Sequence, residues 1–196
     1  MKKEPENMTP EELGQQFPIM LIRPNPEWIR LFKAEKGKIE NILGPGNIIR
    51  IEHIGSTAIP GLLSKPTIDM IIEIPEKINN ENIIKGLKSI DYHYIQRLDN
   101  PPPHMMFAKG YTKNGFKGQA YHIHIRYSGD WDEIYFRDYL KKNPGAASEY
   151  GVLKHKLAEK YKNDREAYTN GKTDFVKRIT AIARKDFHKP LSNYKK

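Results

Sequence analysis

Apolar residues along this chain follow two different spacings, and the change between them lies near residue 130. Before it, apolar and β-branched residues form short runs separated by Gly, Pro and Asn, a pattern typical of strands. Beyond it, apolar residues recur three or four positions apart, the spacing of one helical face. The predicted strands are Ile19–Arg23, Ile48–Ile54, Thr67–Ile74, Tyr92–Leu98, Met105–Lys109 and Ala120–Tyr127. The pattern predicts an α+β fold in which a mixed β-sheet flanked by helices is followed by a C-terminal helical cap.

Helices are predicted where capping residues precede a helical pattern. Thr9 is followed by a proline at the first helical position and by Glu12, the signature of a capping box. Asn25 opens a longer helix that ends at Gly44. Further helices are predicted over Asn79–Ile90, Trp131–Lys142, Pro144–Tyr161 and from Thr173 onward. The turn at Asn114 and Gly115 is expected to join two strands as a hairpin.

The whole chain is expected to form a single domain. A length of 196 residues with 38% hydrophobic content is enough to bury a core. No internal repeat or long linker divides the sequence. The prediction is therefore one domain over residues 1–196, with a sheet core at about 19–127 and a helical part at about 131–189.

Composition narrows the chemistry and the location. The chain has no cysteine, so disulfides and thiolate chemistry are excluded and any metal must rest on His, Asp and Glu. No apolar run approaches the roughly 20 residues that span a bilayer, and the first residues lack the apolar stretch of a signal peptide. We expect a cytoplasmic protein with no membrane partner.

The net charge of +9 favours anionic partners, among them nucleotides, phosphorylated metabolites and nucleic acid. Much of the excess lies after residue 140, where lysines alternate with acids along predicted helices. A charge run of that kind is usually a solvated helix face, so charge alone does not identify the partner.

The stretch EHIGSTAIPGLLSKPTID, residues 52–69, is the most unusual in the chain. Gly55 allows a sharp turn whose backbone N–H groups can cradle a phosphate. Ser56 and Thr57 add hydroxyl donors, and Lys65 adds a positive charge. A loop rich in turn formers can equally be a plain connection between strands. The position of Asp69 favours function, because a carboxylate at the start of a buried strand needs a metal, a lysine or a backbone cap as partner.

Two histidines supply further candidate chemistry. His122 and His124 lie two residues apart on a predicted strand, so both side chains leave the same face and can hold one metal. His53, two residues before Gly55, is expected to approach the same pocket. Together with Asp69 these side chains suit zinc or manganese better than magnesium, which prefers oxygen ligands. Two other uses stay open: a histidine acting as general base with Asp69 orienting it, or a structural role without metal.

Several cations and aromatics are candidates for completing an anion pocket. The cations are Lys65, Arg126, Arg137, Lys154 and Lys172. Arginine offers two parallel donors to a phosphate, whereas structural salt bridges are the alternative for each residue, above all where Arg137 stands beside Asp138. Tyr150 and Tyr168 either stack on a base or fill the core.

These residues carry a family resemblance. A strand that ends in Gly-Ser, followed by Asp69 at the start of an apolar strand, resembles the nucleotidyltransferase superfamily. Together with YHIHI, FRDYLKKNP and the set Tyr150, Leu153 and Lys154, it resembles the GrpB family over roughly residues 20 to 185. The resemblance implies a nucleotidyltransferase-like fold, a Gly-Ser turn that holds a nucleotide's phosphates, and acids that hold a divalent metal. It also implies a link to coenzyme A metabolism, because some members are fused to dephospho-CoA kinase.

The chain departs from the superfamily pattern at one important position. A full nucleotidyltransferase centre has a second acid two residues after the first, and here that residue is Ile71. Glu73 lies on the same face but about 13 Å beyond Asp69, at about 3.3 Å of rise per residue. It therefore does not replace the missing ligand, and the pattern lacks the second acid that two-metal chemistry of the usual sort requires.

Three functions compete on this sequence. The first is an enzyme that binds a nucleoside triphosphate and transfers a nucleotidyl group with a divalent metal, either Mg, Mn or Zn, using Asp69, His122 and His124. The second is a non-catalytic domain that binds a phosphorylated metabolite or assists a partner. The third is a nucleic-acid binder, favoured only by charge and lacking a recognition motif. The first two require that Asp69, His122, His124 and the turn at Gly55 line one cavity.

Overall fold

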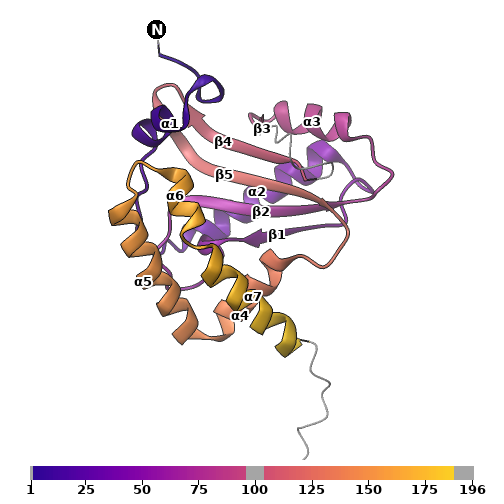
Figure 1. The fold of residues 1–196 in the computed structure, drawn as a ribbon. Helices are drawn as coiled ribbons and strands as arrows, with labels where there is room; N and C mark the ends of the chain where they lie inside the picture. The colour runs from indigo at the N-terminus through magenta and orange to yellow at the C-terminus, as the bar shows by residue number, and fades with distance from the viewer. Residues whose placement is uncertain (1, 96–103, 188–196) are drawn as a thin grey trace, which may run out of the picture.

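The computed structural model describes residues 2–95 and 104–187 and contains a five-stranded mixed sheet (Figure 1). The strands are β1 (Arg50–Ile54), β2 (Thr67–Ile74), β3 (His93–Ile95), β4 (Met106–Thr112) and β5 (Gly115–Tyr127). The helices are η1 (Pro5–Asn7), α1 (Pro10–Gln16), α2 (Glu27–Leu43), η2 (Ser56–Ala58), α3 (Asn80–Lys88), α4 (Asp132–Lys142), α5 (Pro144–Lys160), α6 (Arg165–Asn170) and α7 (Thr173–Phe187).

The sheet has the order β1-β2-β5-β4-β3. Strand β2 runs antiparallel to β1 and parallel to β5, whereas β4 is antiparallel to both β5 and β3. Nearly every residue of β2 is buried, as its continuous apolar sequence predicts for a central strand. The parallel register places Asp69 opposite His122 and Ile71 opposite His124.

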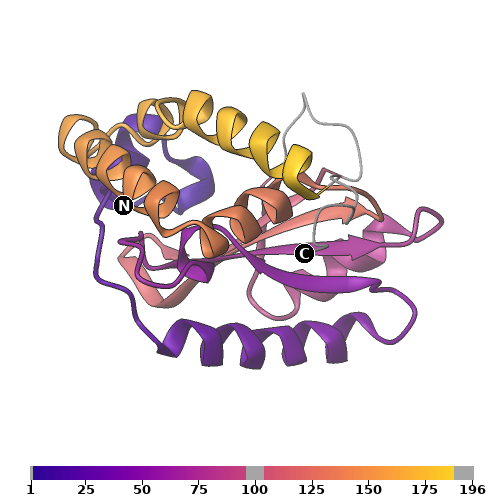
Figure 2. The same ribbon diagram turned by 90° about the horizontal axis from the view of Figure 1, so that it is seen from below.

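One face of the sheet packs on α2 and α3. Because side chains alternate along a strand, Ile68, Met70 and Ile72 of β2 lie on the same face as Ile123 and Ile125 of β5. They form the main core with apolar residues of the two helices. Figure 2 shows α2 running along this side of the sheet, while α5, α6 and α7 lie on the other side.

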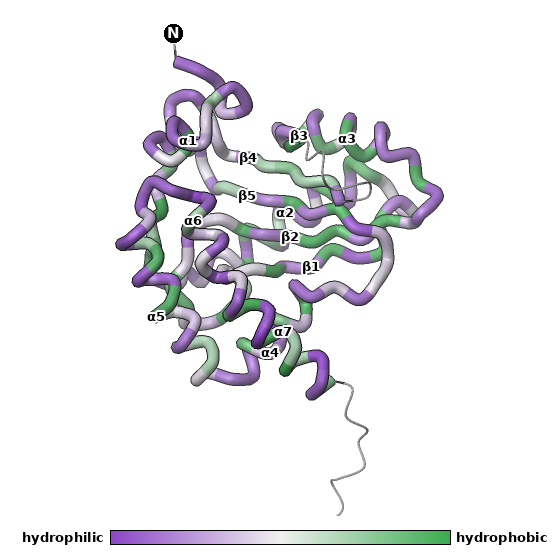
Figure 3. The backbone as a smooth tube through the Cα atoms, viewed as in Figure 1, coloured by the Kyte–Doolittle hydropathy of each residue, from purple (hydrophilic) through white to green (hydrophobic). Residues whose placement is uncertain are grey.

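The other face of the sheet is covered by the C-terminal helices. A second apolar cluster joins them to the loop that follows η2, and its members are Ile59, Leu62, Phe136, Leu140, Tyr150, Phe175 and Ile179. In Figure 3 hydrophobic colour is concentrated along the central strands, whereas the C-terminal helices alternate between hydrophilic and hydrophobic positions. The alternate residues of β2 and β5, including Asp69 and His122, point toward this helical layer rather than into the main core.

The structure confirms the predicted α+β fold and most elements. The strand predicted over Ile19–Arg23 is wrong: only Ile22 forms an isolated bridge, to Ser64, because this segment runs beside a loop rather than the sheet. Helix α6 was not predicted. The strand predicted over Tyr92–Leu98 is β3, and residues 96–98 lie outside the described residues, as do residues 188 and 189 of the helical part. Within the described ranges, no helix is both long and apolar enough to cross a membrane.

Candidate functional site

A cavity of about 870 Å³ lies between the sheet and the C-terminal helices. Its floor includes Asp69 of β2 with His122 and His124 of β5, and Gly55 and Ser56 border it at the end of β1. The opposite wall comes from α5, α6 and the short segment before α7. Asp69, His122, His124 and the turn at Gly55, which the sequence pattern placed around one pocket, therefore lie together in the fold.

The turn at Gly55 passes directly over Asp69. Ile54 pairs with Asp69 in the β1–β2 register, so the next residue leaves the strand above the carboxylate. Gly55 has φ of 70°, and a Cβ atom built on it would lie 2.4 Å from Asp69 Oδ2. Both the left-handed backbone and the close approach require glycine. This contact explains why a Gly-Ser turn and an acid on the following strand occur together.

Asp69, His122 and Tyr111 form a hydrogen-bonded chain. His122 Nδ1 lies 3.1 Å from Asp69 Oδ1, and His122 Nε2 lies 3.0 Å from the Tyr111 hydroxyl. Burial favours the neutral form of Asp69, but the hydrogen bond from His122 and the charge of Lys65 outweigh it, so the pKa of Asp69 lies below its ordinary value. An ionised Asp69 accepts from Nδ1–H, and in that neutral tautomer of the ring Nε2 accepts from Tyr111.

His124 faces the same cavity beside this chain. Burial lowers the pKa of His124 to about 4, although the negative charge of Asp69 opposes the shift. The imidazole is therefore neutral at physiological pH. A neutral imidazole offers one donor and one acceptor to a ligand in the cavity.

His53 and Thr57 do not line this cavity, which corrects the expectation that they join the site. His53 alternates with Ile54 along β1 and lies on the α2 side, where its ring stacks on Phe32 at 4.9 Å. Its Nε2 lies 3.0 Å from Thr57 Oγ1, which in turn donates to the carbonyl of Thr67. Burial lowers the pKa of His53 to about 4. The pair fixes the loop beneath the site instead of contacting a ligand.

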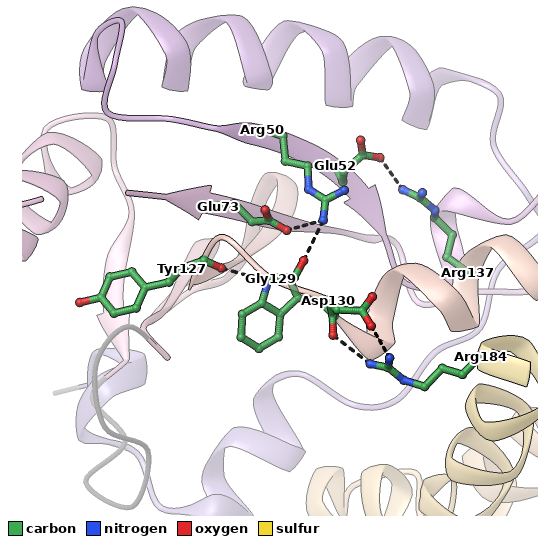
Figure 4. Close-up of polar contacts among 9 residues, drawn as sticks. Arg50, Glu52, Glu73, Tyr127, Gly129, Asp130, Arg137 and Arg184 are labelled. Carbon is green, nitrogen blue, oxygen red and sulfur yellow. Dashed lines mark hydrogen bonds and ion pairs between the residues drawn. The ribbon is translucent and has the colours of Figure 1, made fainter. Parts of the chain in front are cut away.

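The side chains around Asp69 do not fit the divalent metal that the resemblance implies. Both ring nitrogens of His122 already have hydrogen-bond partners, and Ile71 is fully buried. Glu73 is also buried and is paired with Arg50, as Figure 4 shows. Among the residues that the structure describes, no group of three or more His, Asp or Glu side chains could hold a metal ion.

Three lysines from separate elements face the cavity: Lys65 from the loop before β2, Lys154 from α5 and Lys172 from the segment before α7. Lys154 is only 1% exposed and donates to the carbonyl of Leu63. Lys65 and Lys172 lie over the ring of Tyr168, 5.6 and 4.4 Å from its centre. We call Lys65, Lys154 and Lys172 the lysine cluster.

Burial lowers the pKa of each member of the lysine cluster, to about 7 for Lys154 and about 8 for Lys65 and Lys172. Neighbouring cations lower the pKa of Lys65 and Lys154 further, and Asp69 partly opposes the shift in all three. The cavity thus concentrates positive charge that is poorly solvated. An anionic ligand would offset the electrostatic cost of this buried positive charge.

Arg165 is a cavity residue that the sequence analysis missed. It begins α6 and donates to the carbonyl of Phe17 at 2.7 Å. Asp164 caps this helix by accepting from the backbone of Ala167. The Asp164 cap is the signal that could have revealed the helix, but α6 has only 6 residues and its apolar pattern is too short to read.

Of the two arginines predicted in the anion pocket, Arg137 is outside it. Its guanidinium is buried and donates to Glu52 at 2.7 Å (Figure 4). It also donates to Asp138 at 2.7 Å and to the carbonyl of His53 at 2.9 Å. The anion-binding role predicted for Arg137 is corrected, because these acceptors use its donors to join α4 to β1. Arg126 does line the cavity, where it donates to Glu133 at 3.3 Å.

Tyr150 and Tyr168 combine the two alternatives left open by the sequence. Both are buried, yet both border the cavity. The Tyr150 ring stacks on Phe175 at 5.1 Å, so one of its faces belongs to the helical core. Tyr168 instead places its ring beneath the ammonium groups of Lys65 and Lys172.

Comparisons with known proteins agree with this architecture. A family model described as GrpB protein matches residues 18–181. A glutamate-rich protein GrpB from Alkalihalophilus pseudofirmus is 38% identical over 168 residues, covering 82% of this chain and 93% of that protein. The crystal structure of conserved protein GrpB from Enterococcus faecalis has a TM-score of 0.75 and 28% identity, and the match covers 87% of this chain and all of that one.

A more distant relative has a named enzymatic function. It is a dephospho-CoA kinase from Mycolicibacterium paratuberculosis, 24% identical over 177 residues. The match covers 77% of this chain but only 42% of the kinase. More than half of that relative therefore has no counterpart in this chain.

Proposed function

We propose a nucleotide-binding function from one premise: the chain belongs to the GrpB family, whose model matches residues 18–181. The proposed ligand is a nucleoside triphosphate or a similarly phosphorylated metabolite. Its phosphates would lie between the turn at Gly55 and Ser56 and the lysine cluster. The observation that carries this proposal is the convergence of Lys65, Lys154 and Lys172 on a single cavity.

The energetic argument starts from the cost of burying ammonium groups. A charged group removed from water is destabilising unless it is paired. Lys154 has one carbonyl acceptor, and Lys65 and Lys172 share the ring of Tyr168. A phosphate chain supplies several anionic acceptors at once, and charge-assisted hydrogen bonds to it are stronger than neutral ones. Neutral ligands would leave this charge uncompensated.

The same site supports a nucleotidyl transfer. In the proposed step, an acceptor hydroxyl oxygen bonds to the α-phosphorus of the nucleotide and its proton goes to the Asp69 carboxylate. The bond from the α-phosphorus to the bridging oxygen breaks, and pyrophosphate leaves with that electron pair toward the lysine cluster. His122 would hold the carboxylate in place through its hydrogen bond at 3.1 Å.

Binding is tested by calorimetry with each nucleoside triphosphate, comparing the protein with Lys154→Met and with Lys156→Met. Lys156 is an exposed lysine on the same helix, so its variant controls for a general loss of positive charge. We expect Lys154→Met to weaken binding about 10- to 100-fold, because a charge-assisted hydrogen bond is lost. Equal affinity in the two variants, or no binding of any nucleotide, would reject the proposal.

A non-catalytic role is the second candidate, and the kinase relative favours it. In that protein the matching region accounts for only 42% of the length, which is the arrangement expected of an appended accessory domain. Ile71 in place of an acid favours it as well. Nucleotide binding without pyrophosphate release, with every acceptor tried, would support the accessory role. Pyrophosphate release by the wild-type protein that is lost in Asp69→Asn would instead support the nucleotidyl transfer.

A further inference from the structure

We infer that the lysine cluster takes the place of a protein-held divalent cation, so that the cavity binds a polyphosphate chain in the absence of metal. This inference rests on the proposed function and goes beyond it by specifying the ionic form of the ligand. Free polyphosphate, rather than its magnesium complex, is the form that the cavity selects.

The first argument is the arrangement of acidic side chains. A divalent cation bridging protein and phosphate needs several carboxylate oxygens aimed at one point. Asp69 is the one carboxylate on the β2 part of the cavity lining, because position 71 is isoleucine and Glu73 is turned to Arg50. Glu133 borders the cavity from α4 and pairs with Arg126. Glu166 is on the α6 wall, in the layer opposite Asp69.

The second argument is the number and origin of the cations. Lys65 comes from the loop below the site, Lys154 and Lys172 come from the helical layer, and Arg165 stands at the start of α6. They line the cavity from two sides. Figure 2 shows the sheet and the helical layer lying one over the other. A ligand lying between the layers contacts cations on both. Such a cage neutralises a phosphate chain without a bound metal ion.

The third argument is the electrostatic repulsion within the lysine cluster. The ammonium groups repel one another, and burial makes that repulsion costly. A magnesium ion entering with the phosphates adds positive charge to a region that already has an excess. Magnesium also occupies the phosphate oxygens that the lysines would contact. The metal complex should therefore bind more weakly than the free chain.

The test is calorimetric titration of inorganic tripolyphosphate into the protein, first with EDTA and then with excess Mg²⁺. We expect binding in EDTA and at least about tenfold weaker binding with Mg²⁺, the effect of losing one or more charge-assisted contacts. Lys154→Met and, separately, Lys172→Met should weaken binding in EDTA about tenfold or more, and Lys156→Met should not. The two variants are independent, so misfolding of one does not remove the test.

The variant Asp69→Asn distinguishes direct binding by the lysine cluster from binding through a metal ion held by Asp69. Asparagine keeps the shape and the acceptor for His122 but removes the negative charge. If the lysine cluster binds the chain directly, this variant binds tripolyphosphate about three- to tenfold more tightly in EDTA at a pH below 7, where the lysines are protonated, because a like charge near the ligand is gone. If a metal held by Asp69 mediates binding, the variant loses affinity.

The outcomes distinguish this inference from the proposed function. Binding that requires Mg²⁺ and is lost in Asp69→Asn would overturn metal-free binding and leave a phosphate-binding cavity. Absence of binding under both conditions would overturn both. Binding in EDTA that is insensitive to Lys154→Met and Lys172→Met would also overturn the inference, because the charge would then act from elsewhere.

Discussion

Gly55 shows at the scale of one residue how the fold brings a turn and an acid together. Its positive φ and its position above Asp69 exclude any side chain. Gly61 also has a positive φ, of 76°, but a Cβ there meets nothing within 4 Å. The two glycines therefore share the backbone requirement and differ only in the close approach to Asp69.

We predict that Gly55→Ala lowers the free energy of unfolding by about 2–4 kcal/mol, since backbone strain and a clash with a carboxylate add. Gly61→Ala should cost only about 1 kcal/mol, the strain alone. Urea denaturation of both variants measures the difference. Equal losses would mean that the carboxylate moves aside easily and that the turn does not depend on its contact with Asp69.

Lys154 is the residue in which burial and charge conflict most strongly. Its pKa in the folded protein is about 7, whereas the ordinary value for lysine is 10.5. Between these values the unfolded chain binds a proton that the folded chain has released. Stability therefore rises as pH increases from about 7 toward 10.5, and below about 7 the full cost of the buried charge is present.

We predict that Lys154→Met raises the free energy of unfolding at pH 7 by about 1–2 kcal/mol, because methionine fills a similar space without a buried charge. The gain should shrink as the pH approaches 9, where the wild-type lysine is neutral in the fold. Denaturation at pH 6, 7 and 9, with Lys156→Met as the control, measures it. A gain that does not depend on pH would contradict this electrostatic account.

The sequence analysis named the cavity residues of β2 and β5 and the lysine cluster, but it misplaced His53 and missed Arg165. Asp69, His122 and His124 follow from strand periodicity, because a period of two residues fixes which side chains share a face. The same rule could have placed His53 on the face of the sheet that Asp69 does not share. Strand β1 is antiparallel to β2, and His53 pairs with Met70, which lies on the core face. Arg165 lies on a six-residue helix that has too little pattern to predict.

At the scale of elements, Arg137 joins α4 to β1 through its bonds to Glu52 and the carbonyl of His53. Figure 4 shows the Arg137–Glu52 contact and the Arg50–Glu73 pair in the same region. Sequence could not decide between this role and anion binding, since both use the same guanidinium donors. The role of Arg137 depends on whether its face of α4 turns toward β1 or toward the cavity. The packing of α4 against α7 and β1 decides this orientation.

We predict that Arg137→Met lowers the free energy of unfolding by about 2–4 kcal/mol and leaves tripolyphosphate affinity unchanged, because it removes a buried donor that serves the interface and not the cavity. Arg178→Met removes the exposed pair with Glu149 and should change stability by less than about 1 kcal/mol. Denaturation and calorimetry on both variants test this. Loss of affinity at unchanged stability would return Arg137 to the anion pocket.

The whole molecule consists of a sheet that carries Asp69 and the Gly55 turn, and a helical layer that carries most of the cavity's cations. The fold class and the order of these two parts follow from the sequence, because each has its own apolar period. The cavity between them does not follow from the sequence. Its walls include segments about 100 residues apart in the chain, and these share no local pattern. Phe136 of α4 and Phe175 of α7 belong to the apolar cluster that packs the helical layer together.

A phosphate chain that contacts both layers should stabilise them as a unit. We predict that saturating tripolyphosphate slows amide hydrogen exchange in α5 and α6 more than in α2, because α2 lies on the far side of the sheet. In Lys154→Met the ligand should no longer slow exchange in α5, while protection of α2 in the free protein stays as in wild type. Exchange slowed equally in all three helices would indicate general stabilisation without bridging. Exchange slowed only around β1 and β2 would place the anion on the Gly55 turn alone, and the helical layer would then have no part in recognising the ligand.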